Sequence, residues 1–511
     1  MIPDNTPVII GVGQHSERPQ DAGYEALSHM DMAGRALQAA IDDCRAAQPV
    51  APEIELIAAL RQWENSYYGA PSPFGRSNNP PRSIARRVGA DPERAVLEVT
   101  GGQAPQKLVG EIAEHIAHCE FELAAIVGAE AVSTVLTLLG QGHQPDWSEE
   151  IEGELDDRGY GSERIFEKEW LKHATLGVIG GYACVDNARR HRLGLSLDQY
   201  RQQMGELFAP FTKVAAANPH SAAPVVRSAE ELATVTERNR IVAEPYTRMT
   251  VARDQVNQGA AILISSVRKA RELGVPEDRW VHIHSVATAN ELKVLRRPDL
   301  SRSPASTASV ERTLELSGLD LGGVRYLDLY SCFAAPLFNL TDHFGLSADD
   351  PRGLTLTGGL PFFGGPGNNY SSHAIAEAVA RCRADRGAYA LVGANGGILS
   401  KYATGIYSTE PADWNSAVRY HRMSIPQRPE PLDSAPKGDV TVETYTWSVD
   451  KDADKVRSSV IVRTADGKRA LIRPDHRDAA TRTLFESGKP FGVKLVVGQD
   501  GHGANIGRVS A

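Results

Sequence analysis

The chain contains the same order of predicted strands and helices twice, and this duplication constrains the fold more than any other feature of its 511 residues. Each copy begins with an apolar run typical of a buried strand and continues with a segment of helical spacing. The paired segments are 8–13 with 280–286, 32–47 with 307–317, 54–60 with 324–330, 97–102 with 354–359, 123–127 with 389–392, and 260–265 with 404–407. Strands that alternate with helices predict two α/β halves with mostly parallel sheets, covered on both faces.

The duplicated region divides into an N-terminal half, residues 1–270, and a C-terminal half, residues 271–412. An insertion at about 134–250 interrupts the first half between its fourth and fifth strands. It contains a helical pattern over 196–208 that begins at Ser196, a residue favoured as an N-cap. Insertions of this size usually shape a substrate site or an interface.

The residue composition and pattern of the sequence change after residue 412. Four prolines (Pro426, Pro429, Pro431 and Pro436) predict a stiff, exposed linker that covers 413–429 and continues into the next domain. Residues 430–511 contain short β-rich runs at 440–449, 458–464, 469–472 and 491–497, separated by turn residues. They predict a small antiparallel β-barrel, OB-like in type. Basic and acidic residues are nearly balanced there, so no nucleic-acid partner is expected.

Composition excludes several classes of protein. No apolar run approaches the ~20 residues that a membrane span needs, and no secretory signal begins the chain, so a cytoplasmic location without membrane contact is expected. The five cysteines include no CxxC pair, which argues against a disulfide framework and a zinc ribbon, and we expect no metal. The net charge of −9 also argues against nucleic acid, whose phosphates need clustered Lys and Arg.

Three segments resemble the thiolase superfamily. Residues 127–133 resemble the segment that precedes the thiolase loop domain, 257–261 resemble its Asn-Asp-Gly-Ala-Ala, and 182–200 resemble a helix pair of the sterol-carrier-type thiolases. The nearest match is the mycobacterial-type thiolase-like proteins with a C-terminal extension. The resemblance covers about residues 6–410. It implies two βαβαβαββ halves layered α/β/α/β/α, a homodimer or a monomer, and acyl-CoA as substrate or ligand with no tightly bound cofactor.

The same resemblance identifies four loops that carry the catalytic residues of thiolases, and three of these loops lack the catalytic residue here. Gly101 stands where the nucleophilic cysteine belongs, Gly365 where the histidine belongs, and Gly393 where the acid/base cysteine belongs. Glycine has no side chain with which to attack or to transfer a proton. Acyl transfer through the usual cysteine is therefore excluded, whereas Gly101, Gly365 and Gly393 remain as backbone contacts for a substrate.

Further candidates lie in and beside these loops. Tyr330, at the histidine position of the fourth loop, is interpreted either as an acid/base or as a packed side chain, and Cys332 either as a displaced nucleophile or as a structural residue. His373 and Asn395 complete the candidate catalytic set. Asn368 and Asn369 are candidate substrate-binding amides that could meet a thioester carbonyl. Lys213, Asn218 and Arg248 are candidates for CoA contacts, with a solvated surface as the alternative for each.

Three functions are compatible with these residues. The first is C–C bond cleavage or formation on an acyl-CoA without a cysteinyl intermediate, with Tyr330 as acid/base and backbone amides near Gly101 and Gly393 as the oxyanion site. The second is a catalytically silent acyl-CoA-binding or scaffold protein that recruits a protein partner through its C-terminal domain. The third is an acetyl-CoA acetyltransferase with Cys332 as nucleophile. The sequence does not decide whether the protein is an enzyme. We expect the barrel to pack against the α/β body.

Overall fold

The two halves share one large sheet. In the computed structural model, which describes residues 2–161, 165–173, 176–449 and 456–510, eleven strands belong to it. The first half supplies β1 (Pro7–Ser16), β2 (Leu56–Ala59), β3 (Arg94–Leu97), β4 (Leu123–Ala131) and β8 (Asn257–Ser266), and the second β9 (Val281–Asn290), β10 (Tyr326–Asp328), β11 (Tyr389–Gly396) and β12 (Lys401–Ser408). The order is β10-β11-β12-β9-β1-β8-β4-β2-β3-β5, with the halves joined where β1 pairs with β9.

The sheet is mixed, so the prediction of mostly parallel sheets was wrong. β2 pairs in parallel with β3 and β4, and β10 pairs in parallel with β11. β8 runs antiparallel to β1 and β4, and β12 runs antiparallel to β9 and β11. In the first half, β8 follows the insertion and lies beside β4; in the second half, β12 follows a short turn and lies beside β11. Each of these last strands runs opposite to the strand beside which it returns.

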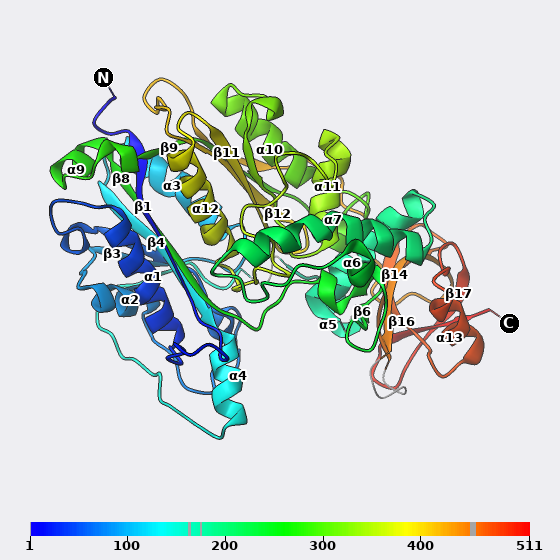
Figure 1. Cartoon of the computed structure of the whole chain (residues 1–511). Coiled ribbons are helices and arrows are strands. Elements are labelled where there is room, and N and C mark those ends of the chain that lie inside the picture. Colours follow the sequence, from blue (N-terminus) through cyan, green and yellow to red (C-terminus); the bar gives the residue numbers. More distant parts are fainter. Residues whose placement is uncertain (1, 162–164, 174–175, 450–455, 511) are drawn as a thin grey trace.

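Helices form three layers around the two parts of the sheet (Figure 1). α1 (His29–Asp43) and α2 (Pro80–Val88) cover the outer face of the first half, and α10 (Pro304–Ser317) and α11 (Ala334–Phe344) that of the second. α3 (Ala104–Ala117) and α12 (Tyr370–Ala384) lie between them and contact strands of both halves. Successive side chains of β1 point to opposite faces of the sheet, so Ile9 packs in the central layer and Val8 and Ile10 pack in the outer one. This confirms the predicted α/β/α/β/α layering.

The third strand expected in the second half, residues 354–359, is absent from the described structure of that segment. The cause is Asp328 at the end of β10, whose Oδ2 accepts hydrogen bonds from the backbone N–H groups of Leu356 (2.7 Å) and Thr357 (3.2 Å). A backbone N–H that donates to a carboxylate does not donate to a neighbouring strand. The segment therefore runs beside β10 as an irregular loop.

The insertion forms mostly helices. In chain order it contains α4 (Val132–Gly140), β5 (Asp156–Asp157), α5 (Lys168–His173), α6 (Gly177–Arg192), α7 (Leu197–Ala217), α8 (Ala229–Ala233), β6 (Ile241–Ala243) and β7 (Tyr246–Thr247). Ser196 caps α7 as expected, in a capping box with Gln199. β5 pairs in parallel with β3 and so covers the outer edge of the sheet. None of the described helices is both long and apolar enough to span a bilayer.

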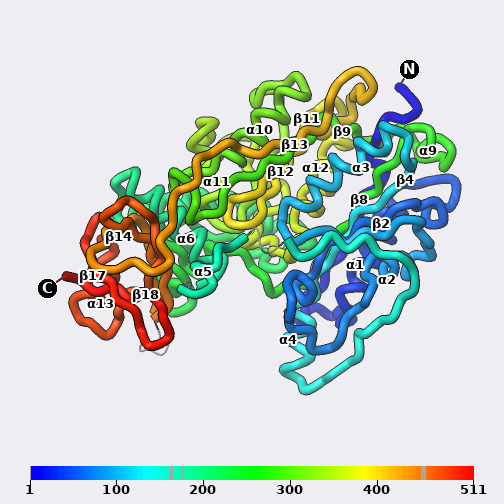
Figure 2. Tube along the Cα trace, turned by 180° about the vertical axis from the view of Figure 1, so that it is seen from behind, coloured from blue at the N-terminus to red at the C-terminus, as the bar shows by residue number. Residues whose placement is uncertain are grey.

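The C-terminal region folds as a closed barrel of five strands, β14 (Gly438–Val449), β15 (Val456–Thr464), β16 (Arg469–Pro474), β17 (Lys494–Gln499) and β18 (Asn505–Val509), in the order β14-β15-β16-β18-β17. This confirms the predicted small barrel, although β16 and β18 pair in parallel, so it is not antiparallel throughout. α13 (Ala479–Glu486) between β16 and β17, and the strand β18, were not predicted. The barrel packs against α5 and α6 of the body (Figure 2).

The segment interpreted as an exposed linker differs from that expectation. Residues 420–424 form β13 (Tyr420–Ser424), which pairs in parallel with β9 inside the large sheet. Tyr420 is buried against α3, where its ring meets Gly110. The connection to the barrel is thus anchored in the body before the proline-rich residues begin.

Candidate functional site

The loops predicted to carry chemistry meet beneath the N-terminus of α12. The hydroxyl of Tyr330 lies against Gly102, so a Cβ at that glycine would overlap it and would come within 2.6 Å of the Asn395 carbonyl oxygen. The Asn395 Nδ2 atom lies 3.9 Å from Cys332 Sγ. The structure therefore brings Gly101, Gly102, Tyr330, Cys332 and Asn395 into one cluster, which we call the inner cluster.

Side chains of the chain itself occupy the space that a side chain at Gly101, Gly393 or Gly396 would need. A Cβ on Gly101 or on Gly396 would overlap the side-chain oxygen of Gln103, and a Cβ on Gly393 would overlap the hydroxyl of Tyr402. Gln103 and Tyr402 are both buried. Neither was singled out from the sequence. Polar groups therefore fill the space beside these glycines.

Backbone and amide donors around the inner cluster are already used. The Gly101 N–H donates to Asn368 Oδ1 (2.8 Å), and Asn368 Nδ2 donates to the Arg61 carbonyl oxygen (2.7 Å). Asn369 Nδ2 donates to the Gly128 carbonyl, and Asn395 Nδ2 donates to the Tyr182 hydroxyl (2.6 Å). These amides, expected to meet a thioester carbonyl, instead hold the loops in place.

Three side-chain acceptors remain unpaired. Gln103 Oε1, Asn369 Oδ1 and Asn395 Oδ1 are buried and receive no hydrogen bond from any residue that the structure describes. A buried acceptor without a donor costs about 1–3 kcal/mol, so such groups usually mark a site that something else completes. Apart from the hydroxyls of Tyr330 and Tyr402, the unpaired groups of the cluster are acceptors, whereas an oxyanion requires donors.

Burial keeps the tyrosine hydroxyls and the cysteine thiol of the cluster protonated. Burial, with a smaller contribution from Cys332, raises the pKa of Tyr330 well above its ordinary value. Burial likewise raises the pKa of Cys332 to about 12 and that of Tyr182 far above its ordinary value. At neutral pH the cluster contains protonated phenols and a thiol rather than a thiolate.

The other predicted residues lie elsewhere. His373 is buried on α12, with Nδ1 2.7 Å from Gln14 Oε1 and its ring against Phe363. Burial, reinforced by nearby His220, lowers its pKa, which makes the ring neutral. Gly365 is buried, and its N–H donates to the Arg253 carbonyl oxygen (2.7 Å), which holds its loop against residue 253. The structure therefore does not bring His373 to Tyr330.

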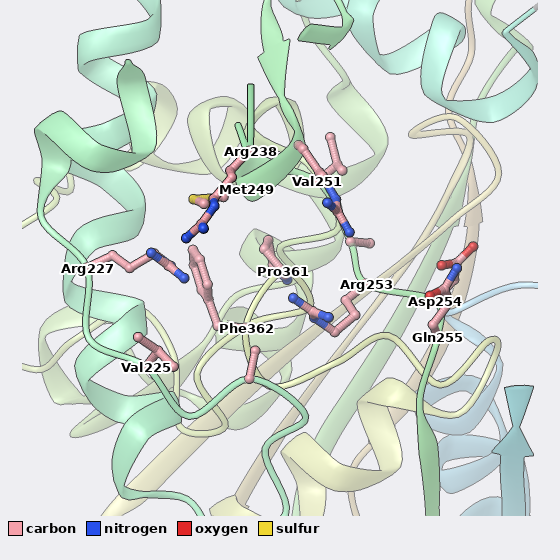
Figure 3. Close-up of a pocket in the computed structure, with 13 residues that line it drawn as sticks. Val225, Arg227, Arg238, Met249, Val251, Arg253, Asp254, Gln255, Pro361 and Phe362 are labelled. Atoms are coloured by element: carbon pink, nitrogen blue, oxygen red, sulfur yellow. The ribbon is translucent and has the colours of Figure 1, made fainter. Parts of the chain in front are cut away.

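A pocket of about 390 Å³ opens beside the inner cluster, at the junction of the insertion and the loop that holds Pro361 and Phe362. Four arginines line it, namely Arg227, Arg238, Arg248 and Arg253, together with Asp254. Figure 3 shows the guanidinium groups of Arg227, Arg238 and Arg253 converging around Phe362 and Pro361. Of the predicted CoA contacts, Arg248 lies here.

The other two predicted CoA contacts lie outside this pocket. Lys213 is exposed on α7. Asn218 is buried at the end of that helix, where its Nδ2 donates to Glu377 Oε1 (3.1 Å).

Three of the four pocket arginines lack acidic partners among the described residues. The side chains of Arg238, Arg248 and Arg253 form no ion pair or hydrogen bond with the described residues, and Arg227 approaches only Glu231, at 3.7 Å. Partial loss of hydration, followed by repulsion from Arg248 and Arg227, lowers the pKa of Arg253. Uncompensated cations around a concave site favour an anionic ligand. Among the described residues no cluster of side chains could hold a metal ion.

The pocket and the inner cluster are joined through backbone contacts. Ala252, in the pocket wall, donates its N–H to the carbonyl oxygen of Cys332 (2.9 Å). Arg253 likewise donates its N–H to the Leu360 carbonyl oxygen (3.1 Å). The pocket wall at Ala252 is therefore hydrogen-bonded directly to the loop that carries Cys332.

Comparisons with known proteins agree with this architecture. Residues 424–502 match the family model described as the thiolase-like protein type 1 additional C-terminal domain. The crystal structure of a monomeric SCP2-thiolase-like protein type 1 from Mycobacterium smegmatis has 42% sequence identity and a TM-score of 0.83, with 100% of both chains covered. No match was found among curated protein sequences.

Two more distant structures share the fold of the body. The Ltp2-ChsH2(DUF35) aldolase has 17% identity and a TM-score of 0.57, with 81% of this chain and 100% of that chain covered. The acetyl-CoA acetyltransferase from Syntrophomonas wolfei has 14% identity and a TM-score of 0.55, with 79% of this chain and 99% of that chain covered.

Proposed function

The chain belongs to the SCP2-thiolase-like protein type 1 family, and we propose that it binds the coenzyme A moiety in the arginine-lined pocket without catalysing thiolysis. The observation that carries the proposal is the set of pocket arginines without acidic partners. CoA bears a diphosphate and a 3′-phosphate, which such arginines bind by charge-assisted hydrogen bonds. Phe362 and Pro361 offer an apolar surface for the rest of the nucleotide.

The absence of thiolysis follows from the inner cluster. Gly101, Gly365 and Gly393 supply neither nucleophile nor base, and the thiol of Cys332 has a pKa of about 12. A nucleophilic cysteine requires the thiolate at neutral pH. Cys332 therefore does not replace the missing nucleophile, and the acetyltransferase hypothesis loses its central residue.

C–C bond chemistry remains a second candidate because of Tyr330. Its hydroxyl forms no hydrogen bond within the described part of the chain and stays protonated, so it has a proton to donate to a ligand. The unpaired acceptors around it, however, do not stabilise the enolate or alkoxide that such a reaction forms. Non-covalent binding is thus better supported than catalysis.

We assign the C-terminal barrel to the OB type, because it has a helix between its third and fourth strands and pairs its third and fifth strands in parallel. Its first two strands contact α6 of the body. We propose that the barrel is a fixed part of a cytoplasmic CoA-binding protein, and that a protein partner would meet its remaining outer face.

Isothermal titration calorimetry tests the binding site. We expect CoA to bind the wild type, and dephospho-CoA to bind more weakly because it lacks the 3′-phosphate. The double variant Arg248→Ala/Arg253→Ala should lose at least tenfold in affinity, at about 1.5–3 kcal/mol for a charge-assisted hydrogen bond. Arg240→Ala is the matched control, an exposed arginine of the same region outside the pocket. Equal affinity in the double variant and the control would refute this site.

A further inference from the structure

We infer that the inner cluster accepts the thiol of free coenzyme A and disfavours acyl thioesters, and that Gln103 is the residue that makes this distinction. The inference rests on the proposed function, because it assumes that CoA enters from the arginine-lined pocket. It concerns the end of the ligand that carries the sulfur, whereas the pocket arginines concern its phosphates.

The first argument is space. The Gln103 amide lies between Gly101 and Gly396 so closely that a single methyl group on either glycine would overlap its oxygen. The Tyr330 hydroxyl closes the cluster at Gly102 in the same way, and the Tyr402 hydroxyl closes it at Gly393. Well-packed interiors tolerate extra atoms only at a cost of about 1–3 kcal/mol. An acyl group would have to displace these side chains, whereas a thiol needs less room.

The second argument is hydrogen bonding. The Tyr182 hydroxyl donates to the Gly397 carbonyl oxygen (2.8 Å), so it can only accept from Asn395. This fixes the Asn395 amide with Nδ2 toward Tyr182, and its Oδ1 is the atom left unpaired. Gln103 Oε1 is unpaired as well. Both atoms need a donor from outside the chain.

A thiol meets this need and a thioester does not. The S–H group is a weak hydrogen-bond donor, whereas the carbonyl oxygen and sulfur of a thioester only accept. Placing a thioester against Gln103 Oε1 and Asn395 Oδ1 would leave acceptors facing acceptors. Of the donors that could bind its carbonyl, the Gly101 N–H and the Nδ2 atoms of Asn368, Asn369 and Asn395 are committed to the protein. The hydroxyls of Tyr330 and Tyr402, which close the cluster at Gly102 and Gly393, are the donors that remain.

The test compares free CoA with acetyl-CoA and S-methyl-CoA by calorimetry. S-Methyl-CoA adds one carbon and lacks the S–H proton. For the wild type we expect free CoA to bind about tenfold more tightly than either analogue, the effect of one hydrogen bond together with overpacking. Gln103→Ala, which removes both the bulk and the acceptor, should bring the three affinities within about twofold of one another, mainly by strengthening the analogues.

Gln106→Ala is the matched control. Gln106 is another buried glutamine of α3, but it contacts Gly405 and Tyr407 instead of the inner cluster, so its variant should keep the wild-type ratios. Equal affinities for the three ligands in the wild type, or unchanged ratios in a folded Gln103→Ala protein, would overturn the inference while leaving CoA binding intact. A wild type that binds none of the three would refute the proposed function and the inference with it. Thermal melting of each variant establishes that it is folded.

Discussion

At the scale of the residue, burial decides the state of every ionisable group in the inner cluster. Tyr330, Cys332 and Tyr182 are all protonated at neutral pH because the protein interior disfavours their charged forms. Cys332 also has the Asn395 amide 3.9 Å away, too distant to stabilise a thiolate strongly. A reactive cysteine usually has a depressed pKa, so the environment of Cys332 predicts an inert one.

Alkylation measures this directly. At pH 7.5 we expect iodoacetamide to modify Cys332 at least a hundredfold more slowly than Cys119, the one cysteine that is exposed. Peptide-resolved mass spectrometry over time gives both rates in one sample. Cys332→Ser should leave CoA affinity unchanged within twofold. Rapid modification of Cys332 that CoA suppresses would show that the acetyltransferase hypothesis had been set aside wrongly.

Asp186 supports the site from the insertion. Its carboxylate accepts hydrogen bonds from the hydroxyls of Tyr200 and Tyr246 and, at 3.0 Å, from the Ala335 N–H at the start of α11. Burial outweighs these bonds and raises its pKa from 3.8 to about 6. The folded protein therefore binds this proton more tightly than the unfolded chain does.

This pKa shift predicts a pH dependence of stability. Between pH 4 and pH 6 the contribution of Asp186 to the free energy of unfolding should fall as the pH rises, and it should be constant above about pH 6. The difference in unfolding free energy between wild type and Asp186→Asn, measured in urea across this range, should decline accordingly. Asp198→Asn, at an exposed position on α7, controls for the effect of the same substitution outside the interior. A rising difference for Asp186 would contradict the assigned pKa.

The sequence revealed only part of this site. Glycine at positions 101, 365 and 393 was enough to predict the loss of cysteine and histidine chemistry, because that argument needs only residue types in known loops. The filling of the vacated space by Gln103 and Tyr402 depends on side chains that meet in three dimensions from different elements. The one available signal was Gln103 itself, a long polar side chain two residues after Gly101.

At the scale of the element, one arginine holds the barrel to the body. The Arg469 side chain on β16 is 0% exposed and donates to the carbonyl oxygens of Leu295 (2.9 Å) and Arg297 (2.6 Å) in the body. It also pairs with Glu443 of β14 through two hydrogen bonds, of 2.9 and 2.7 Å. Its Nε, Nη1 and Nη2 atoms all donate within this junction, so no shorter or neutral side chain can replace it.

Replacing this arginine should loosen the barrel. We expect Arg469→Met to lower the free energy of unfolding by about 3 kcal/mol, because it leaves two buried carbonyl groups without their donor and removes one of the two arginine partners of Glu443, the other being Arg463. The loss should appear in urea unfolding and as faster proteolysis between residues 425 and 437. Arg482→Met on the outer face of α13 should change neither, since its partner Glu486 is exposed as well. A stable, protease-resistant Arg469→Met protein would show that the other contacts suffice.

Elements were predictable where their signal is local. The apolar runs of β1, β4, β8 and β9 and the capping box of α7 lie where the sequence placed them. The predictions that were wrong concern segments whose structure depends on hydrogen-bond partners distant in the sequence. Asp328 takes the backbone N–H groups of residues 356 and 357, which prevents a strand there, and β9 gives residues 420–424 a strand partner that no local pattern indicates.

At the scale of the whole molecule, the outer edge of the sheet is occupied by the chain itself. β5 of the insertion pairs with β3, and Arg158 next to it forms ion pairs with Glu98 and Glu111, both at 2.6 Å. An uncovered edge strand is a ready site for pairing with another chain. Covering it within one chain removes that route to a dimer, in agreement with the monomeric relative from Mycobacterium smegmatis.

We therefore expect the protein to be monomeric. Sedimentation equilibrium across a dilution series up to about 100 µM should give one species of 55.2 kDa at every concentration. CoA affinity per chain should not depend on protein concentration, because the pocket and the inner cluster belong to a single chain. A mass that increases with concentration would show that a surface other than the edge of β3 supports association.

The contact between α6 and the barrel also has a consequence for how the chain is made. Asn187 of α6 donates to the carbonyl oxygen of Tyr445, and the two residues are separated by 258 positions in the sequence. A ribosome adds about 5–20 residues per second, so the synthesis of β14 follows that of α6 by on the order of half a minute. During that time the barrel-facing side of α6 is open to chaperones and proteases. The last residues to be synthesised are thus the ones that protect a helix made in the first half of translation.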